Sequence, residues 1–231
     1  YRESSPGYQF FHSGQGAVHM ALNYDGKFDK DGYREHARLV SKHIREQGAE
    51  RVLELASGKG FNSIFLARQS PEAQFIGIDL TPLHVKLAKE KGKGISNLDF
   101  QIGNFQHLDF ADQSFDVVFE VESICHALDM RQALSEAHRV LRPGGRFMVF
   151  DGFRKPGFEE LANDVKTAAR ITEISMAVER GWIIDDWIRL SEEVGFTVSQ
   201  VGDLSEAIMP NLMRFQFLAR AYFKYPGLAR S

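Results

Sequence analysis

The stretch VLELASGKGFNS, residues 52–63, decides the fold of this chain. Its first half is an apolar run typical of a buried strand, and the segment that starts at Phe61 is expected to be a helix. Gly58 and Gly60 lie between the two, where they allow a tight turn and the close approach of a ligand to the backbone. The stretch therefore predicts a strand, a ligand-binding turn and a helix in succession.

The same alternation of short apolar segments and amphipathic segments continues to about residue 153. Strands are expected at residues 51–56, 74–80, 98–104, 115–121 and 145–153, and helices at 61–70, 82–92 and 130–141, with Pro143-Gly144-Gly145 ending the last helix. Strands that alternate with helices form a parallel sheet with right-handed crossovers. The fold class predicted is α/β: a Rossmann-like, mostly parallel sheet with helices on both faces, plus helical lid segments.

Four parts of the chain follow from this pattern. They are an N-terminal helical cap (1–48) with a helix at 31–48, a ligand-binding core (49–153), a helical lid insertion (154–182), and a C-terminal part (183–231) with a helix at 184–195, a strand at 196–204 and an apolar helix at 210–225. Ligands bind at the carboxyl ends of the strands in open α/β sheets, and the inserted lid is expected to lie above those ends.

Composition limits the function classes. The chain has 231 residues, 43% of them hydrophobic, and a formal net charge of −3, which is unlike the basic footprint of a nucleic-acid-binding protein. Cys125 is the single cysteine, so no internal disulfide forms, and a cytoplasmic location is expected. The sequence has no apolar run long enough for a membrane span, and no signal peptide is expected from the residues YRESSPGYQF.

The residue that ends the second expected strand indicates the class of ligand. Asp79 follows Gly60 by 19 residues, a position from which a carboxylate accepts both hydroxyls of a ribose. The alternative is that Asp79 only caps the helix that begins at Thr81-Pro82. A dinucleotide-binding turn would have glycine where Ser63 stands, and Gly58-Lys59-Gly60 is not a phosphate-binding loop. The acidic Glu54 in the first strand suits a cationic ligand.

These motifs resemble those of class I S-adenosylmethionine-dependent methyltransferases over about residues 50–153. The residues on the four positions of the first motif are Glu54, Ala56, Gly58 and Gly60, with Ala56 in place of the usual first glycine. The segment GNFQHLDF resembles the third motif, and LRPGGRFMVFD, residues 141–151, resembles the segment that leads into the fifth strand.

The resemblance implies S-adenosyl-L-methionine as methyl donor and S-adenosyl-L-homocysteine as product. It assigns the ribose to Asp79, the adenine to Leu80, Asn104 and Phe105, and the remaining cofactor contacts to Glu54, Ala56, Ser57, Gly58, Gly60, Glu120 and Val121. No phosphate is present in this cofactor, in keeping with the absence of a phosphate-binding loop.

The segment EVESICHALD, residues 120–129, is similar to a region of sterol C-24 methyltransferases and of tocopherol-type methyltransferases. The resemblance implies an apolar acceptor whose alkene carbon takes the methyl group. Glu122 would stabilise the resulting cation and His126 would help to remove a proton. In an O- or N-methyltransferase the same pair would deprotonate a hydroxyl or an amine.

Other interpretations of these residues stay open at this point. The alternative for Glu122 is that it only binds the methionine ammonium group. The alternative for His126 is that it is an ordinary pocket histidine. No spacing of Cys and His residues suggests a metal site. A non-catalytic S-adenosylmethionine-binding module is the alternative of another class.

The N-terminal segment contains aromatic residues ahead of the core. FFHSGQGAVHMAL resembles a glycine-containing region of sterol methyltransferases, although the tryptophans usual there are absent. Tyr8, Phe11, His12 and Tyr24 are expected to line the acceptor pocket, with core packing as the alternative. The apolar C-terminal helix is expected to pack on the lid or on a second copy in a homodimer.

Overall fold

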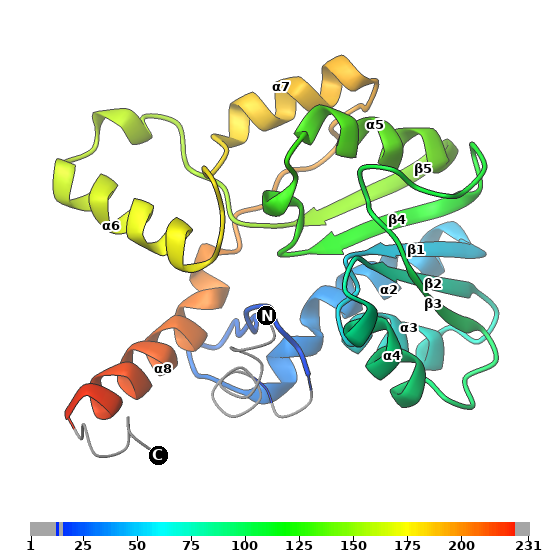
Figure 1. Ribbon diagram of the computed structural model, residues 1–231, viewed down its shortest axis with the longest axis horizontal. Helices are drawn as coiled ribbons and strands as arrows, with labels where there is room; N and C mark the ends of the chain where they lie inside the picture. The colour runs from blue at the N-terminus through cyan, green and yellow to red at the C-terminus, as the bar shows by residue number, and fades with distance from the viewer. Residues whose placement is uncertain (1–12, 14–15, 225–231) are drawn as a thin grey trace.

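The computed structural model describes Ser13 and residues 16–224, apart from the side chains of residues 222 and 223. Its centre is a five-stranded parallel sheet with the order β3-β2-β1-β4-β5 (Figure 1). The strands are β1 (Arg51–Leu55), β2 (Gln74–Asp79), β3 (Leu98–Ile102), β4 (Phe115–Val121) and β5 (Leu141–Phe150). The strand order changes direction between β1 and β4, the place where open α/β sheets bind ligands. The predicted Rossmann-like fold is confirmed.

Helices cover both faces of this sheet. One face carries α2 (Glu35–Gln47), α3 (Phe61–Gln69) and α4 (Pro82–Lys91), and the other carries α5 (Met130–Val140) and α7 (Ile184–Val194) (Figure 1). Successive residues of β1 serve opposite faces, as the pleat requires: Val52 packs with α2 and α3, and Leu53 packs with α5. Burial of both faces explains why the central strand β4 is mostly apolar in sequence, whereas the edge strand β3 carries exposed polar residues.

The remaining elements lie beyond the carboxyl ends of the strands. They are η2 (Lys30–Arg34) before α2, η3 (Ile124–His126) after β4, η4 (Phe158–Glu160) and α6 (Asn163–Ser175) after β5, and α8 (Ser205–Lys224). In Figure 1 the arrowheads of β4 and β5 point toward α6 and α8. The helices predicted in the cap, the lid and the C-terminal part are therefore present, and α8 starts before Pro210 rather than at it.

Two sequence-based expectations are wrong. Residues 196–204 form no strand: Phe196 stacks on Phe147, but the segment stays unpaired, and no described strand pairs with the outer edge of β5. The Pro-Gly-Gly segment does not end the preceding helix, which stops at Val140. It lies within β5 as a bulge, because Phe115 pairs with Leu141 whereas Val117 already pairs with Arg146.

Candidate active site

The turn after β1 has left-handed backbone at three positions. Their φ angles are +51° at Ala56, +54° at Gly58 and +78° at Gly60. The two glycines are needed for different reasons. A Cβ on Gly60 would lie 2.5 Å from the ring of Phe100, so Gly60 permits packing of the turn on the sheet. Among the described residues a Cβ on Gly58 would meet only Val18, at 3.9 Å, which leaves this side of the turn open for a ligand as far as those residues are concerned.

Asp79 reaches from the end of β2 to that turn. Its Oδ2 accepts a hydrogen bond from the Gly58 amide at 2.8 Å, and its Oδ1 accepts one from the Thr81 amide at 2.8 Å. Burial raises the pKa of this carboxyl, but hydrogen bonds from His84, Thr81 and Gly58 outweigh burial and hold the pKa below its usual value. The capping role and a ribose-binding role are thus compatible, since Oδ2, with one hydrogen bond from the Gly58 amide, keeps an acceptor position and the residue stays 8% exposed.

Glu54 supports the turn from within. It is 3% exposed, and its oxygens accept hydrogen bonds from the Asn62 side chain and from the amide and hydroxyl of Ser63 at the start of α3. Burial raises its pKa to about 7, against the opposing effect of the bonds from Ser63 and Asn62. Ser57 is also buried, and its Oγ, which has no hydrogen-bond partner among the described residues, points toward Gly77 of β2. Glu54 thus faces the start of α3 and Ser57 faces β2, rather than the open side of the turn.

The residues assigned to the adenine lie around the ends of β2 and β3. Leu80 is 69% exposed beside Asp79, and an apolar side chain held in solvent next to a ribose-binding carboxylate suits a ring that would cover it. Asn104 uses its Oδ1 to accept the Gln106 amide, and Phe105 is half-buried against the core. Together with the open glycine turn, these side chains fit a nucleoside without a phosphate group. S-adenosylmethionine would supply an electrophilic methyl group here.

Glu120 is used inside the protein. It has no exposed surface, and its oxygens accept hydrogen bonds from the amides of Ser123, Ile124 and Phe150 and from the Ser123 hydroxyl. Burial raises its pKa well above the usual value. These bonds fix the loop after β4, so Glu120 supports the site instead of facing a ligand. Val121 is half-buried and packs against the core.

Glu122 is a largely buried carboxyl group that lies on the wall of the cavity described below. Its backbone has φ +50°, which turns the chain sharply at the end of β4. Its Oε1 accepts a hydrogen bond of 2.7 Å from the amide of Met20, 102 residues earlier in the chain. Burial raises the pKa of Glu122 to about 7, the Met20 amide opposes this, and Asp151 adds to it. A carboxyl group with a pKa near 7 holds and releases a proton at neutral pH.

His126 lies on η3, one turn beyond Glu122, and contacts the lid. Its Nδ1 is 3.3 Å from the carbonyl oxygen of Ala177. Cys125, its neighbour, lines the cavity described below, whereas His126 itself does not. The structure therefore brings Glu122 to the cavity wall and leaves His126 at the junction of loop and lid.

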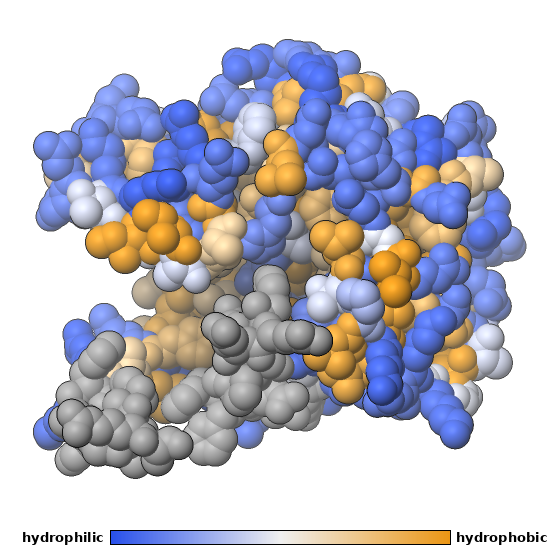
Figure 2. Space-filling view, viewed as in Figure 1, coloured by the Kyte–Doolittle hydropathy of each residue, from blue (hydrophilic) through white to orange (hydrophobic). Residues whose placement is uncertain are grey.

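A cavity of about 1810 Å³ opens at these carboxyl ends and runs along β5. Its walls come from α2, β5, α6, α7, α8 and the unpaired segment 196–204, and Glu122, Cys125 and Asp151 lie on its surface. Figure 2 shows the molecule hollowed between α6 and α8. The apolar side chains that line the cavity from α6, from its C-terminal end and from α8 include Ala169, Met176, Ile208 and Leu212. The space and its walls suit an apolar molecule much larger than a methyl donor.

The expected aromatic pocket is only partly within the described residues. Tyr8, Phe11 and His12 lie outside them, and Tyr24 is 64% exposed at the rim of the cavity. The sequence did not indicate two described residues of this segment that reach the turn and Glu122. Val18 lies over Gly58, and the Met20 amide binds Glu122. Neither contact has a sequence signal, because one is a van der Waals contact and the other uses the backbone.

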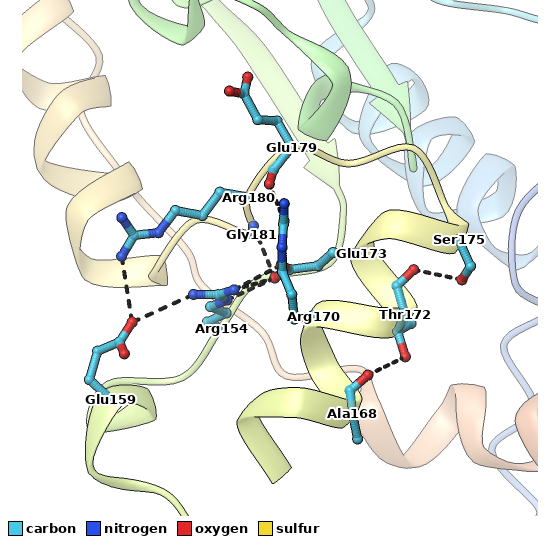
Figure 3. A network of polar contacts seen from close by, with 10 residues as sticks. All are labelled: Arg154, Glu159, Ala168, Arg170, Thr172, Glu173, Ser175, Glu179, Arg180 and Gly181. Atoms are coloured by element: carbon cyan, nitrogen blue, oxygen red, sulfur yellow. Dashed lines mark hydrogen bonds and ion pairs between the residues drawn. The ribbon is translucent and has the colours of Figure 1, made fainter. Parts of the chain in front are cut away.

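One carboxylate connects the beginning and the end of the lid. Glu173 of α6 accepts hydrogen bonds of 2.8 Å from both Nε and Nη2 of Arg154, at the start of the lid, and one of 3.0 Å from the amide of Gly181, near its end (Figure 3). Arg154 also stacks on Phe158 and forms an isolated parallel bridge with Ile183. The chain thus leaves and re-enters the core at neighbouring points.

Comparison with known proteins agrees with this geometry. A family model described as a methyltransferase domain matches residues 46–195, which is most of the chain. The chain belongs to this methyltransferase family. The resemblance to S-adenosylmethionine-dependent methyltransferases is thereby confirmed.

Relatives of this methyltransferase domain include enzymes of lipid-like substrates. It is 26% identical over 199 residues to 24-methylenesterol C-methyltransferase 3 of Arabidopsis thaliana, covering 82% of this chain and 54% of the relative. It is 39% identical over 120 residues to phthiotriol/phenolphthiotriol dimycocerosates methyltransferase of Mycobacterium tuberculosis, covering 51% of this chain and 44% of the relative. The chain spans about half the length of these curated relatives.

The solved structure of the [4+2]-cyclase SpnF has the same fold. Its TM-score is 0.76 at 20% identity, and the match covers 95% of this chain and 78% of that one. A cyclase on this fold shows that fold alone does not determine the reaction.

Two further features are absent from the described residues. Their helices include none with the length and apolar character of a membrane span. Within the same residues no group of three or more His, Cys, Asp or Glu side chains is arranged to hold a metal ion.

Proposed function

We propose that this protein transfers the methyl group of S-adenosylmethionine to a carbon atom of an apolar acceptor that contains an alkene. The donor lies against the glycine turn with its ribose at Asp79, and the acceptor occupies the cavity beside Glu122. The observation that carries the proposal is a carboxyl group with a pKa near 7 on the wall of a large, partly apolar cavity at the carboxyl ends of β4 and β5.

The roles of the residues follow from the chemistry. Attack of the alkene on the methyl carbon breaks the bond from sulfur to methyl, forms a new carbon–carbon bond and leaves a cation on the acceptor. An ionised Glu122 stabilises that cation and accepts the proton whose loss restores an alkene. His126 passes protons at the edge of the lid, next to Ala177. Alignment of the reacting atoms and exclusion of water, by the lid and by the Val18–Met20 segment, supply the rest.

Methyl transfer to oxygen is the second candidate. It is favoured by the 39% identity to a relative whose name includes a triol, since a triol offers hydroxyl groups. In that reaction Glu122 accepts the hydroxyl proton as the oxygen attacks the methyl carbon. The same carboxyl group serves both reactions, so the acceptor must be identified by experiment.

A screen of sterols, isoprenoids, quinols and amines with the methyl donor, read by mass spectrometry for the gain of one methyl group, tests the proposal. Glu122→Gln is expected to lower turnover at least tenfold while S-adenosylhomocysteine affinity, measured by calorimetry, changes less than about threefold. Asp79→Ala is the matched variant on the donor side and is expected to weaken that affinity by at least tenfold. Loss of affinity without loss of turnover in Glu122→Gln would place Glu122 in the donor site instead.

A further inference from the structure

A second carboxyl group, Asp151, lies beside Glu122 on the cavity wall. Val121 and Phe150 form the last pair between β4 and β5, and the Glu122 amide donates to the Phe150 carbonyl oxygen at 2.7 Å. Glu122 and Asp151 are therefore the next residue out of each of two adjacent parallel strands. Glu122, Asp151 and Cys125 line the same cavity.

Asp151 also holds the loop after β4. Its Oδ2 accepts a hydrogen bond of 2.9 Å from the Cys125 amide, and its Oδ1 accepts one of 2.7 Å from the Gly152 amide. Cys125 and His126 are thereby fixed relative to β5. Neither the sequence motifs nor the relatives assign a role to this carboxylate.

We propose that Asp151 is a positioning residue for methyl transfer: it fixes the loop that carries Cys125 and His126, and its negative charge keeps the neighbouring Glu122 a strong proton acceptor. The inference rests on the proposed function. Two adjacent carboxyl groups in a poorly solvated cavity disfavour double ionisation, so one of them takes up the proton released by the acceptor.

Four other titratable side chains lie around this pair of carboxyl groups. Glu120 accepts hydrogen bonds from the loop after β4 and from the Phe150 amide. The Cys125 thiol lies beside Asp151, and His126 favours ionisation of Asp151. Tyr33 of η2 lies near Glu122. Burial raises the pKa of Asp151, the bonds from Cys125 and Gly152 oppose this, and Asp151 in turn raises the pKa of Glu122. The larger number of bonds to Asp151 makes it the member that keeps its charge.

The test follows the titration of Glu122 directly, by carbon-13 NMR of the side-chain carboxyl carbons, with the Glu122 resonance identified by its loss in Glu122→Gln. In Asp151→Asn the midpoint is expected to move down by roughly one pH unit, because a neighbouring negative charge is removed. Asp151→Glu keeps the charge and is expected to keep the midpoint. Asp99→Asn, on the exposed part of β3, is the matched control and is expected to change nothing.

Thermal melting and S-adenosylhomocysteine binding confirm that each variant is folded. If Glu122 titrates at the same pH in folded Asp151→Asn as in the parent protein, the proposal is wrong. With an active acceptor in hand, the acidic limb of the kcat/KM profile is expected to move in the same direction. Absence of methyl transfer to every acceptor would count against the proposed function alone, since the NMR titration needs no acceptor.

Discussion

Glu54 and Glu122 are two carboxyl groups whose pKa values burial raises to about 7, but their neighbours give them different roles. Glu54 is closed in by the start of α3, with hydrogen bonds from Asn62 and Ser63. Glu122 has a hydrogen bond from one described residue, Met20, and faces the cavity. The first therefore affects stability, and the second is available for chemistry.

Glu54→Gln tests this difference. The unfolded chain releases the Glu54 proton near pH 4.5 and the folded protein only near 7, so its contribution to stability is complete below pH 4.5 and is lost as the pH rises through 7. The loss is about 3 kcal/mol. The uncharged glutamine avoids this loss. Asn62, whose Oδ1 has no hydrogen-bond partner among the described residues, can flip its side-chain amide so that Oδ1 accepts from the new glutamine amide.

Urea unfolding of both proteins at pH 5 and pH 8 measures the effect. The variant is expected to match the parent at pH 5 and to exceed it at pH 8. An equal fall in the free energy of unfolding in both proteins between these pH values would assign the pH dependence to other groups.

At the scale of elements, the lid is tied to the core through Glu173. Its partner Arg154 has a side chain only 11% exposed, and Arg170 of the same helix donates to the Glu179 carbonyl oxygen (Figure 3). Glu173→Ala leaves the Arg154 guanidinium without its bidentate partner and the Gly181 amide without its acceptor. The lid is therefore expected to loosen while the sheet stays intact.

Limited proteolysis measures this prediction. Cleavage within residues 155–181 is expected to be at least tenfold faster in Glu173→Ala, and KM for the acceptor is expected to rise more than the Kd for S-adenosylhomocysteine. Glu179→Ala is the matched control, because Figure 3 shows its carboxylate pointing away from the network. Equal cleavage rates in the two variants would mean that other contacts hold the lid.

Sequence reasoning predicted elements where local pattern and long-range pairing agree. The five strands and the glycine turn are such cases. Residues 196–204 are the opposite case: Phe196 is half-buried by packing on Phe147, but Val201 is 61% exposed, and without a neighbouring strand among the described residues the alternating pattern produces no ladder. In the site, the motifs indicated Asp79 and Glu122, but the Met20 amide and Asp151 reach the site through distant pairings that no local pattern encodes.

At the scale of the whole molecule, α8 is connected to Glu122 through the N-terminal segment. Asn211 of α8 has no exposed surface, its Oδ1 accepts from the Ala21 amide at 3.2 Å, and its Nδ2 contacts the sulfur of Met20 at 3.5 Å. The Met20 amide then donates to Glu122. Asn211 therefore positions a hydrogen-bond donor at the cavity wall, the Met20 amide, which lies 191 positions earlier in the chain.

Asn211→Ala is expected to move the Glu122 titration to higher pH, opposite to the effect of Asp151→Asn, because the Met20 amide lowers the pKa of Glu122 and the variant releases it. The lost buried hydrogen bonds are expected to lower the free energy of unfolding by about 1–3 kcal/mol. Carbon-13 NMR and urea unfolding measure the two effects. Gln216→Ala, on the exposed side of the same helix, is the control, and an unshifted Glu122 midpoint in Asn211→Ala would break the proposed connection.

The bridge between Arg154 and Ile183 has a consequence for how such proteins diversify. Because the two ends of the lid meet, the residues between them form a cassette that can be lengthened, shortened or transplanted without displacing β5 or α7. A chimera that receives the cassette of another such protein is expected to keep its methyl-donor site and to change its acceptor specificity.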